Sequence, residues 1–126
     1  QVSFTECFAS FADMVRVPAL EEEALCVMDE LGMAHGPVAP PSGSSDVGNV
    51  SYRCPTIQPL VSICEDFHPL HTPEFQAVIT CPAAHQAIAQ GARLIAALVY
   101  RTLTDGDFRQ ALRTSWQGAR KRKLEG

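Results

Sequence analysis

This sequence of 126 residues lacks several patterns that would assign it to a class. No apolar run approaches the ~20 residues that a membrane-spanning helix needs, and no charged-then-apolar leader is present, so we expect no membrane partner. The absence of a Cys-x-x-Cys pair removes the usual signature of a structural zinc knuckle. The five cysteines are an odd number without a repeating spacing, which argues against a disulfide framework and favours reduced thiols in the cytoplasm.

Basic residues are few. Ten Lys and Arg stand against 14 Asp and Glu, a formal net charge of −4, so we expect no general nucleic-acid binding. The exception is the basic run Arg120-Lys121-Arg122-Lys123, which is typical of a solvated, disordered tail over residues 119–126. A hydrophobic share of 46% with 19% charged residues is typical of one globular domain.

Three segments have the features of helices. In residues 18–31, apolar side chains recur at three- and four-residue steps, and Gly32 marks the end. One apolar face repeats in the same way over residues 82–103. Thr104 or Asp105 then caps a last helix with apolar side chains at four-residue intervals.

A Gly-, Pro- and Ser-rich stretch precedes a nearly continuous apolar run over residues 56–64. Such a run suits a central strand that is covered on both faces, although Pro59 cannot donate to a strand ladder. One strand cannot make a sheet, so its partners must come from the lead-in segment 1–17 or from outside this chain. The sequence therefore predicts an α/β fold, mainly helices packed on a small sheet.

Two short motifs carry polar residues. The loop 43–51 reads Gly-Ser-Ser-Asp-Val-Gly-Asn-Val-Ser and holds one carboxylate, that of Asp46, for which capping a turn is one role. About twenty residues later, His71-Thr-Pro-Glu-Phe places an imidazole in a turn whose backbone Pro73 restricts. Neutral imidazole is a common zinc ligand, and Glu74 can hold the ring or the turn through a hydrogen bond.

Together these motifs resemble the dinuclear-zinc amidohydrolases and metallopeptidases, the relatives of aminoacylase, carboxypeptidase-G and aminobenzoyl-glutamate hydrolase. Residues 70–75 look like the motif that supplies the last metal ligand in that family. Residues 43–51 look like the Gly-Ser-Thr-Asp-x-Gly-Asn-Val-Ser loop of the aminobenzoyl-glutamate-hydrolase branch. The resemblance runs from roughly residue 10 to residue 112, and it implies that residues 18–118 are the C-terminal portion of a catalytic domain with an incomplete three-layer fold.

The resemblance also implies roles for individual residues. His71 would bind one of two zinc ions in the complete enzyme, supported by Glu74. The loop would contact an N-acyl amino acid or a dipeptide-like substrate, whose amide bond is hydrolysed. The loop residues concerned are Ser44, Ser45, Asp46 and Asn49.

This sequence departs from the family pattern at its metal ligands. No histidine starts the His-x-Asp pair of the family, and the run Glu21-Glu22-Glu23 opens a helix, so we interpret it as capping charge. We therefore expect the other ligands and the general base upstream of Gln1, and no activity from this chain alone.

Two alternatives stay open. A non-catalytic interaction domain, derived from the same fold, would bind a partner through the apolar face that the missing half leaves bare. Both this domain and the enzyme fragment predict association, with the missing half or with a second copy, because monomers seldom expose a large apolar patch. A thiol-based redox protein has five cysteines in its favour but no motif, and ranks last.

Overall fold

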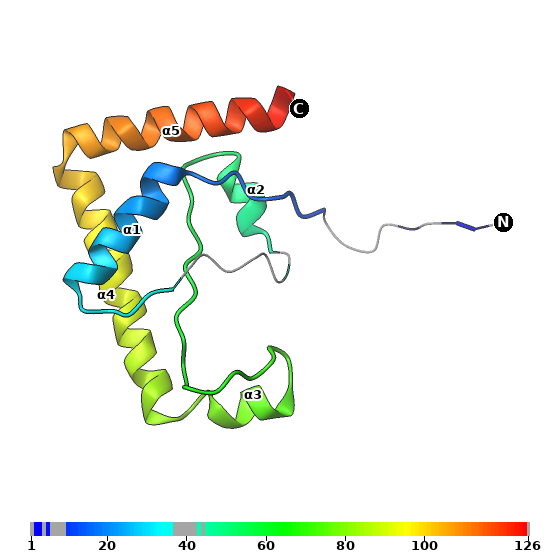
Figure 1. Cartoon of the computed structure of the whole chain (residues 1–126). Helices are drawn as coiled ribbons and strands as arrows, with labels where there is room; N and C mark the ends of the chain where they lie inside the picture. Colours follow the sequence, from blue (N-terminus) through cyan, green and yellow to red (C-terminus); the bar gives the residue numbers. More distant parts are fainter. Residues whose placement is uncertain (1, 4, 6–9, 37–42, 44, 126) are drawn as a thin grey trace.

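The computed structural model describes residues 2–3, 5, 10–36, 43 and 45–125. These residues form five helices: α1 (Pro18–Glu30), α2 (Val47–Ser51), α3 (Pro73–Val78), α4 (Pro82–Thr104) and α5 (Gly106–Glu125). Helices α1, α4 and α5 pack on one another. Figure 1 shows α2 close to α5 and α3 beside the start of α4, with long extended segments joining them.

Helix α1 begins and ends with local signals. Pro18 occupies the first turn, where its missing N–H is not needed. At the other end, Gly32 has a φ of 65°, in the left-handed region that glycine adopts readily. The Met33 N–H then donates to the Met28 carbonyl at 2.8 Å, and the Gly32 N–H donates to the Asp29 carbonyl at 3.0 Å. These two bonds form a Schellman motif and confirm the predicted end of the helix.

Side chains also cap the two other long helices, α4 and α5. The Ala84 N–H donates to the Sγ of Cys81 at 3.4 Å, which caps the start of α4. Asp105 ends α4, and its side chain accepts the N–H of Phe108 at 2.9 Å in the first turn of α5. One residue therefore separates the two helices and sets the corner between them. The predicted helix over residues 82–103 and the Asp105 cap are confirmed.

The core lies where α1, α4 and α5 meet, and Leu94 of α4 is completely buried there. Full burial of a leucine side chain contributes about 1.5–3 kcal/mol to the free energy of unfolding. At the edge of this core, Arg101 of α4 pairs with Glu23 and Glu30 of α1. The core residues are Val17, Leu20, Ala24, Val27, Met28, Met33, Leu94, Leu98 and Leu112.

The predicted α/β fold is wrong for this chain, because the described residues contain no β-strand and no sheet. Residues 56–64 are non-helical and run beside α4 (Figure 1). However, no described backbone group pairs with their backbone. Their apolar side chains rest on helices instead, since Ile57 and Val61 pack against the core. The apolar run reflects one-sided contact with helices and not a position inside a sheet.

The structure also describes residues 10–17, before α1, and the basic run near the end of α5. Residues 10–17 carry no regular secondary structure and lead into α1, while residues 1, 4 and 6–9 of the lead-in segment lie outside the described residues. The basic run that was expected to form a tail instead continues α5 to Glu125. Basic side chains near a helix C-terminus are stabilised by the negative end of the helix dipole. Among the described helices, none is long and apolar enough to cross a membrane.

Candidate functional site

His71 lies in the turn that leads into α3, and its φ of 64° places it in the left-handed region. Thr72 fixes this turn: its Oγ1 donates to the Pro69 carbonyl at 2.8 Å and accepts the Phe75 N–H at 3.2 Å. Pro73 follows at the first position of α3. A left-handed backbone costs a non-glycine residue roughly 1–2 kcal/mol, so the capped turn must hold His71 in place.

An open hollow of about 490 Å³ lies beside this turn. Its walls come from the turn and from α3, and they include the apolar side chains of Leu70, Phe75 and Ile79. His71 is exposed at this hollow. The volume of the hollow falls within the roughly 300–1,000 Å³ of small-molecule sites, but the hollow is open to solvent and most of its lining side chains are exposed.

The described residues supply one potential zinc ligand at this turn. Glu74 is exposed in the first turn of α3, and neither it nor His71 has a side-chain partner in the described part of the chain. Across the described ranges, no three His, Cys, Asp or Glu residues gather as a metal-binding group. Zinc takes four ligands, so the described residues do not fit a zinc ion by themselves.

Most of the loop that was predicted to bind substrate lies in or beside the short helix α2. Ser44 is outside the described residues. The Ser45 hydroxyl donates to Oε1 of Gln58 at 3.4 Å, and Asp46 precedes α2 without capping it through its side chain. Figure 1 shows α2 near α5, whereas the turn of His71 lies by α3 at the other end of the molecule. The structure does not bring the two motifs together.

Asn49 and Ser51 form hydrogen bonds with the backbone of residues 10–17, which precede α1 and which we call the extended chain. The Oδ1 of Asn49 accepts the Ala12 N–H at 2.6 Å, and its Nδ2 donates to the Ser10 carbonyl at 3.1 Å. The buried Oγ of Ser51 accepts the Val15 N–H at 2.8 Å. The Asn49 amide is therefore engaged with backbone groups, and the polar motif has a structural role that sequence reasoning missed.

Gly48 is the point of closest approach between α2 and this extended chain. A Cβ at Gly48 would lie 1.9 Å from the carbonyl oxygen of Ala12 and 2.9 Å from its carbonyl carbon. Both are backbone atoms, so neither can rotate away as a flexible side chain would. The glycine in the Val-Gly-Asn sequence is required by this contact. Because residues 43–51 were expected to form a loop, this requirement was not anticipated from the sequence.

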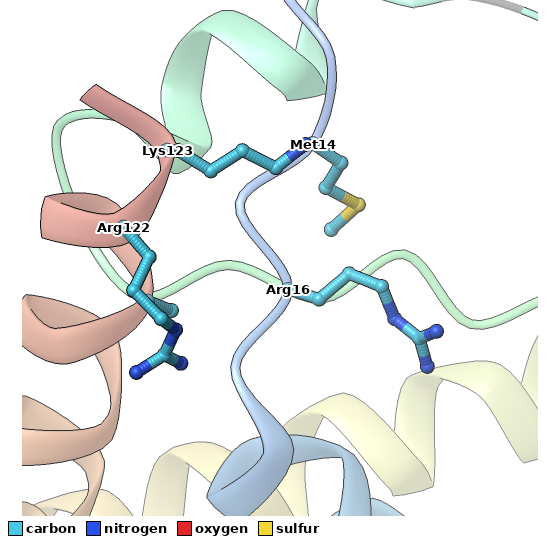
Figure 2. Close-up of a pocket in the computed structure, with 5 residues that line it drawn as sticks. Met14, Arg16, Arg122 and Lys123 are labelled. Atoms are coloured by element: carbon cyan, nitrogen blue, oxygen red, sulfur yellow. The ribbon is translucent and has the colours of Figure 1, made fainter. Parts of the chain in front are cut away.

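A second hollow, of about 390 Å³, lies between the extended chain and the end of α5 (Figure 2). Arg16 pairs with Glu21 at 2.6 Å, and Lys123 pairs with Asp13. Figure 2 shows Arg16 and Arg122 on opposite sides of the extended chain. The cations of this hollow do not converge on one point, and two of them are already neutralised. Its lining residues are Met14, Arg16, Ala119, Arg122 and Lys123.

Asp13 is the electrostatic link between the extended chain and α5. Its carboxylate accepts a hydrogen bond from the Tyr52 hydroxyl at 2.7 Å and pairs with Lys123. The Lys123 ammonium, and after it the Tyr52 hydroxyl, lower the pKa of Asp13. The same carboxylate raises the pKa of Tyr52 and the pKa of Lys123. The folded state therefore favours ionised Asp13.

One face of α4 exposes large apolar side chains. Ile88, Ile95, Val99 and Leu103 are 69%, 61%, 52% and 72% exposed, and their spacing of seven, four and four residues places them in one stripe along the helix. We call these four residues the α4 stripe. Large exposed apolar patches mark interaction sites in soluble proteins, so this stripe is a second candidate site.

Comparison with protein-family models, with curated proteins and with solved structures finds no match to this chain. Its function is therefore inferred from the residues themselves.

Gly48→Ala tests the close approach of α2 to the extended chain. Because the new methyl group meets backbone atoms of Ala12, we expect a loss of about 1–3 kcal/mol in the free energy of unfolding. Urea denaturation measures it. Gly43→Ala is the matched control, since a Cβ there meets nothing within 4 Å. Equal stability of the two variants would contradict the close contact.

Asp13→Asn tests the electrostatic link. A lowered pKa in the folded state means that Asp13 stabilises the protein above its ordinary pKa of 3.8 and loses this contribution as the pH falls further. We expect a lower urea midpoint for the variant at pH 7 and a shrinking difference below pH 3.8. The exposed Asp66→Asn serves as control and should change little at either pH. A difference that grows on acidification would contradict the assignment.

Proposed function

We propose that this chain is part of a zinc-dependent amidohydrolase or peptidase, in which His71 supplies one metal ligand. The observation that carries this proposal is the turn of His71, an exposed imidazole on a left-handed backbone beside an open hollow. Strained backbone positions of this kind cluster at functional sites. The surrounding His-Thr-Pro-Glu-Phe sequence resembles the motif of the last metal ligand in the dinuclear-zinc family.

The remaining ligands and the general base come from polypeptide beyond the described residues, because no three His, Cys, Asp or Glu side chains gather as a metal-binding group among them. The isolated chain is accordingly inactive. The substrate is a small amide, an N-acyl amino acid or a dipeptide-like compound, and the hollow of about 490 Å³ suits a ligand of that size. The odd number of cysteines supports a reducing compartment, the cytoplasm.

Two features of the chain's own residues serve this role. The hydroxyl of Thr72 and the ring of Pro73 fix the backbone at the start of α3, directly after His71, so the His71 imidazole has a defined starting position. The apolar side chains of Leu70 and Ile79 line the same hollow.

His71→Asn in the complete polypeptide that carries this segment in its natural source tests the proposal. Asn tolerates the left-handed backbone, so the turn should survive while the imidazole is lost. Loss of a group that only supports a metal ligand lowers metal affinity or activity by about 10–100-fold. For loss of the ligand itself, we therefore expect a decrease of more than about 100-fold in amidase activity. Metal analysis should find less zinc per chain.

The matched control is His85→Asn, at an exposed position in the first turn of α4. It should keep both zinc and activity. A His71→Asn protein with unchanged metal content and turnover would show that His71 is not a ligand. A native polypeptide that ends close to this segment and binds no zinc would contradict the enzyme assignment as a whole.

The α4 stripe favours a second candidate function, a non-catalytic interaction module. Four large apolar side chains along one helix are unusual on a lone surface, and a helix face with this spacing fits a partner's apolar groove. Such a module would fold and bind without metal.

Ile95→Lys separates the two candidates. The side chain is 61% exposed, so the free energy of unfolding should change by less than about 0.5 kcal/mol. If the stripe is the binding surface, the affinity for a purified partner, measured by calorimetry, should fall at least tenfold. Gln90→Lys, at an exposed position of the same helix outside the stripe, is the control and should bind normally. Equal affinities would exclude the stripe.

A further inference from the structure

Residues 57–63 have the side-chain pattern of a β-strand, although the described residues contain no strand with which this segment could pair. From residue 57 to residue 63, partly buried positions alternate strictly with the exposed positions Gln58, Leu60 and Ser62. A period of two is the period of extended chain. The buried side faces the helices: Ile57 and Val61 pack against the core, and Val61 lies 3.9 Å from where a Cβ on Gly91 would be.

The backbone of this segment offers unpaired donors and acceptors. No backbone N–H or carbonyl of residues 55–62 has a hydrogen-bond partner among the described residues. A row of such groups in an extended chain is a template for pairing with another strand.

The two edges of the segment differ in their donors. In an extended chain, the N–H and carbonyl of one residue point to the same edge, and the next residue points to the other. Pro55 and Pro59 fall on the edge of the odd-numbered residues and remove two donors from it. The other edge carries a complete row. We call this row the even edge; it consists of Thr56, Gln58, Leu60 and Ser62.

We propose that the even edge pairs with the even edge of a second copy of this chain, antiparallel about Pro59. Thr56 then faces the partner's Ser62, and Gln58 faces the partner's Leu60, with both backbone hydrogen bonds made in each pair. Pro59 lies on the two-fold axis at a pair that needs no ladder hydrogen bond. This register uses the full length of residues 55–63.

The side chains agree with the same register. Ile57 lies opposite the partner's Val61, so two β-branched apolar side chains meet on the face that rests on the helices. On the other face, Thr56 lies opposite the partner's Ser62, and both are small side chains whose hydroxyls donate within their own chain, to the carbonyls of Cys54 and Cys64. A two-stranded ribbon alone is marginal in water, but here each strand already packs on α4. The pairing is isologous and independent of the proposed metal ligand.

Leu60→Pro in the 126-residue chain tests this pairing against Leu60→Ala. Leu60 is 72% exposed, so neither change removes a core contact, and residue 59 already has the restricted backbone of proline. Proline removes one donor from each of the two central pairs, whereas alanine keeps it. By sedimentation equilibrium, we expect the unmodified chain to dimerise. Leu60→Pro should raise the dimer dissociation constant more than tenfold, and Leu60→Ala less than threefold.

Amide hydrogen exchange provides the second measurement. Dimerisation should slow exchange at Gln58 and Leu60 in a concentration-dependent manner and leave Ile57 and Val61 unchanged. A chain that stays monomeric at millimolar concentration would overturn the proposal. Equal dissociation constants for the proline and alanine variants, or a dimer that Ile95→Lys abolishes and Leu60→Pro does not, would overturn it too, the latter in favour of the α4 stripe.

Discussion

The buried hydroxyl of Ser51 is the junction on which the arrangement of this chain depends. Its Oγ accepts the Val15 N–H at 2.8 Å and donates to the Gly48 carbonyl at 2.6 Å, while the Ser51 carbonyl accepts the indole N–H of Trp116 at 2.8 Å. One residue thereby joins the extended chain, α2 and α5. Each of these groups, if buried without a partner, would lower the free energy of unfolding by about 1–3 kcal/mol. The three segments are therefore held in a fixed arrangement.

This junction changes the meaning of the Gly-Ser-Ser-Asp-Val-Gly-Asn-Val-Ser motif. A polar loop suggests contact with a substrate, but here Asn49 and Ser51 bind backbone groups of the extended chain, and Gly48 lets the two backbones approach. The His71 turn is a separate unit, stabilised by its own cap on α3. The chain therefore carries a potential metal ligand, His71, in one region, and in another region a set of contacts that fixes α2 against the extended chain.

Two surfaces remain without a partner among the described residues: the α4 stripe and the even edge. The fold packs helices against one side of the extended segment 55–63, and among the described residues no backbone group hydrogen-bonds to the edges of residues 55–62. A partner of the α4 stripe would bind through apolar contacts, whereas a partner of the even edge would bind through backbone hydrogen bonds. Substitutions that remove one kind of interaction therefore distinguish the two surfaces.

The sequence by itself determined the presence of the three long helices, because their signals are local, but it did not indicate the short helices α2 and α3. Pro18, Gly32 and Asp105 act within a few residues, through dihedral preference or a capping bond, and the turn of His71 was likewise visible as His-Thr-Pro. Only the tertiary structure decided that the apolar run 56–64 has no sheet, since a strand needs partners that its own residues do not specify. It also decided the roles of Gly48 and Asn49, which depend on backbone atoms more than thirty residues away in the chain.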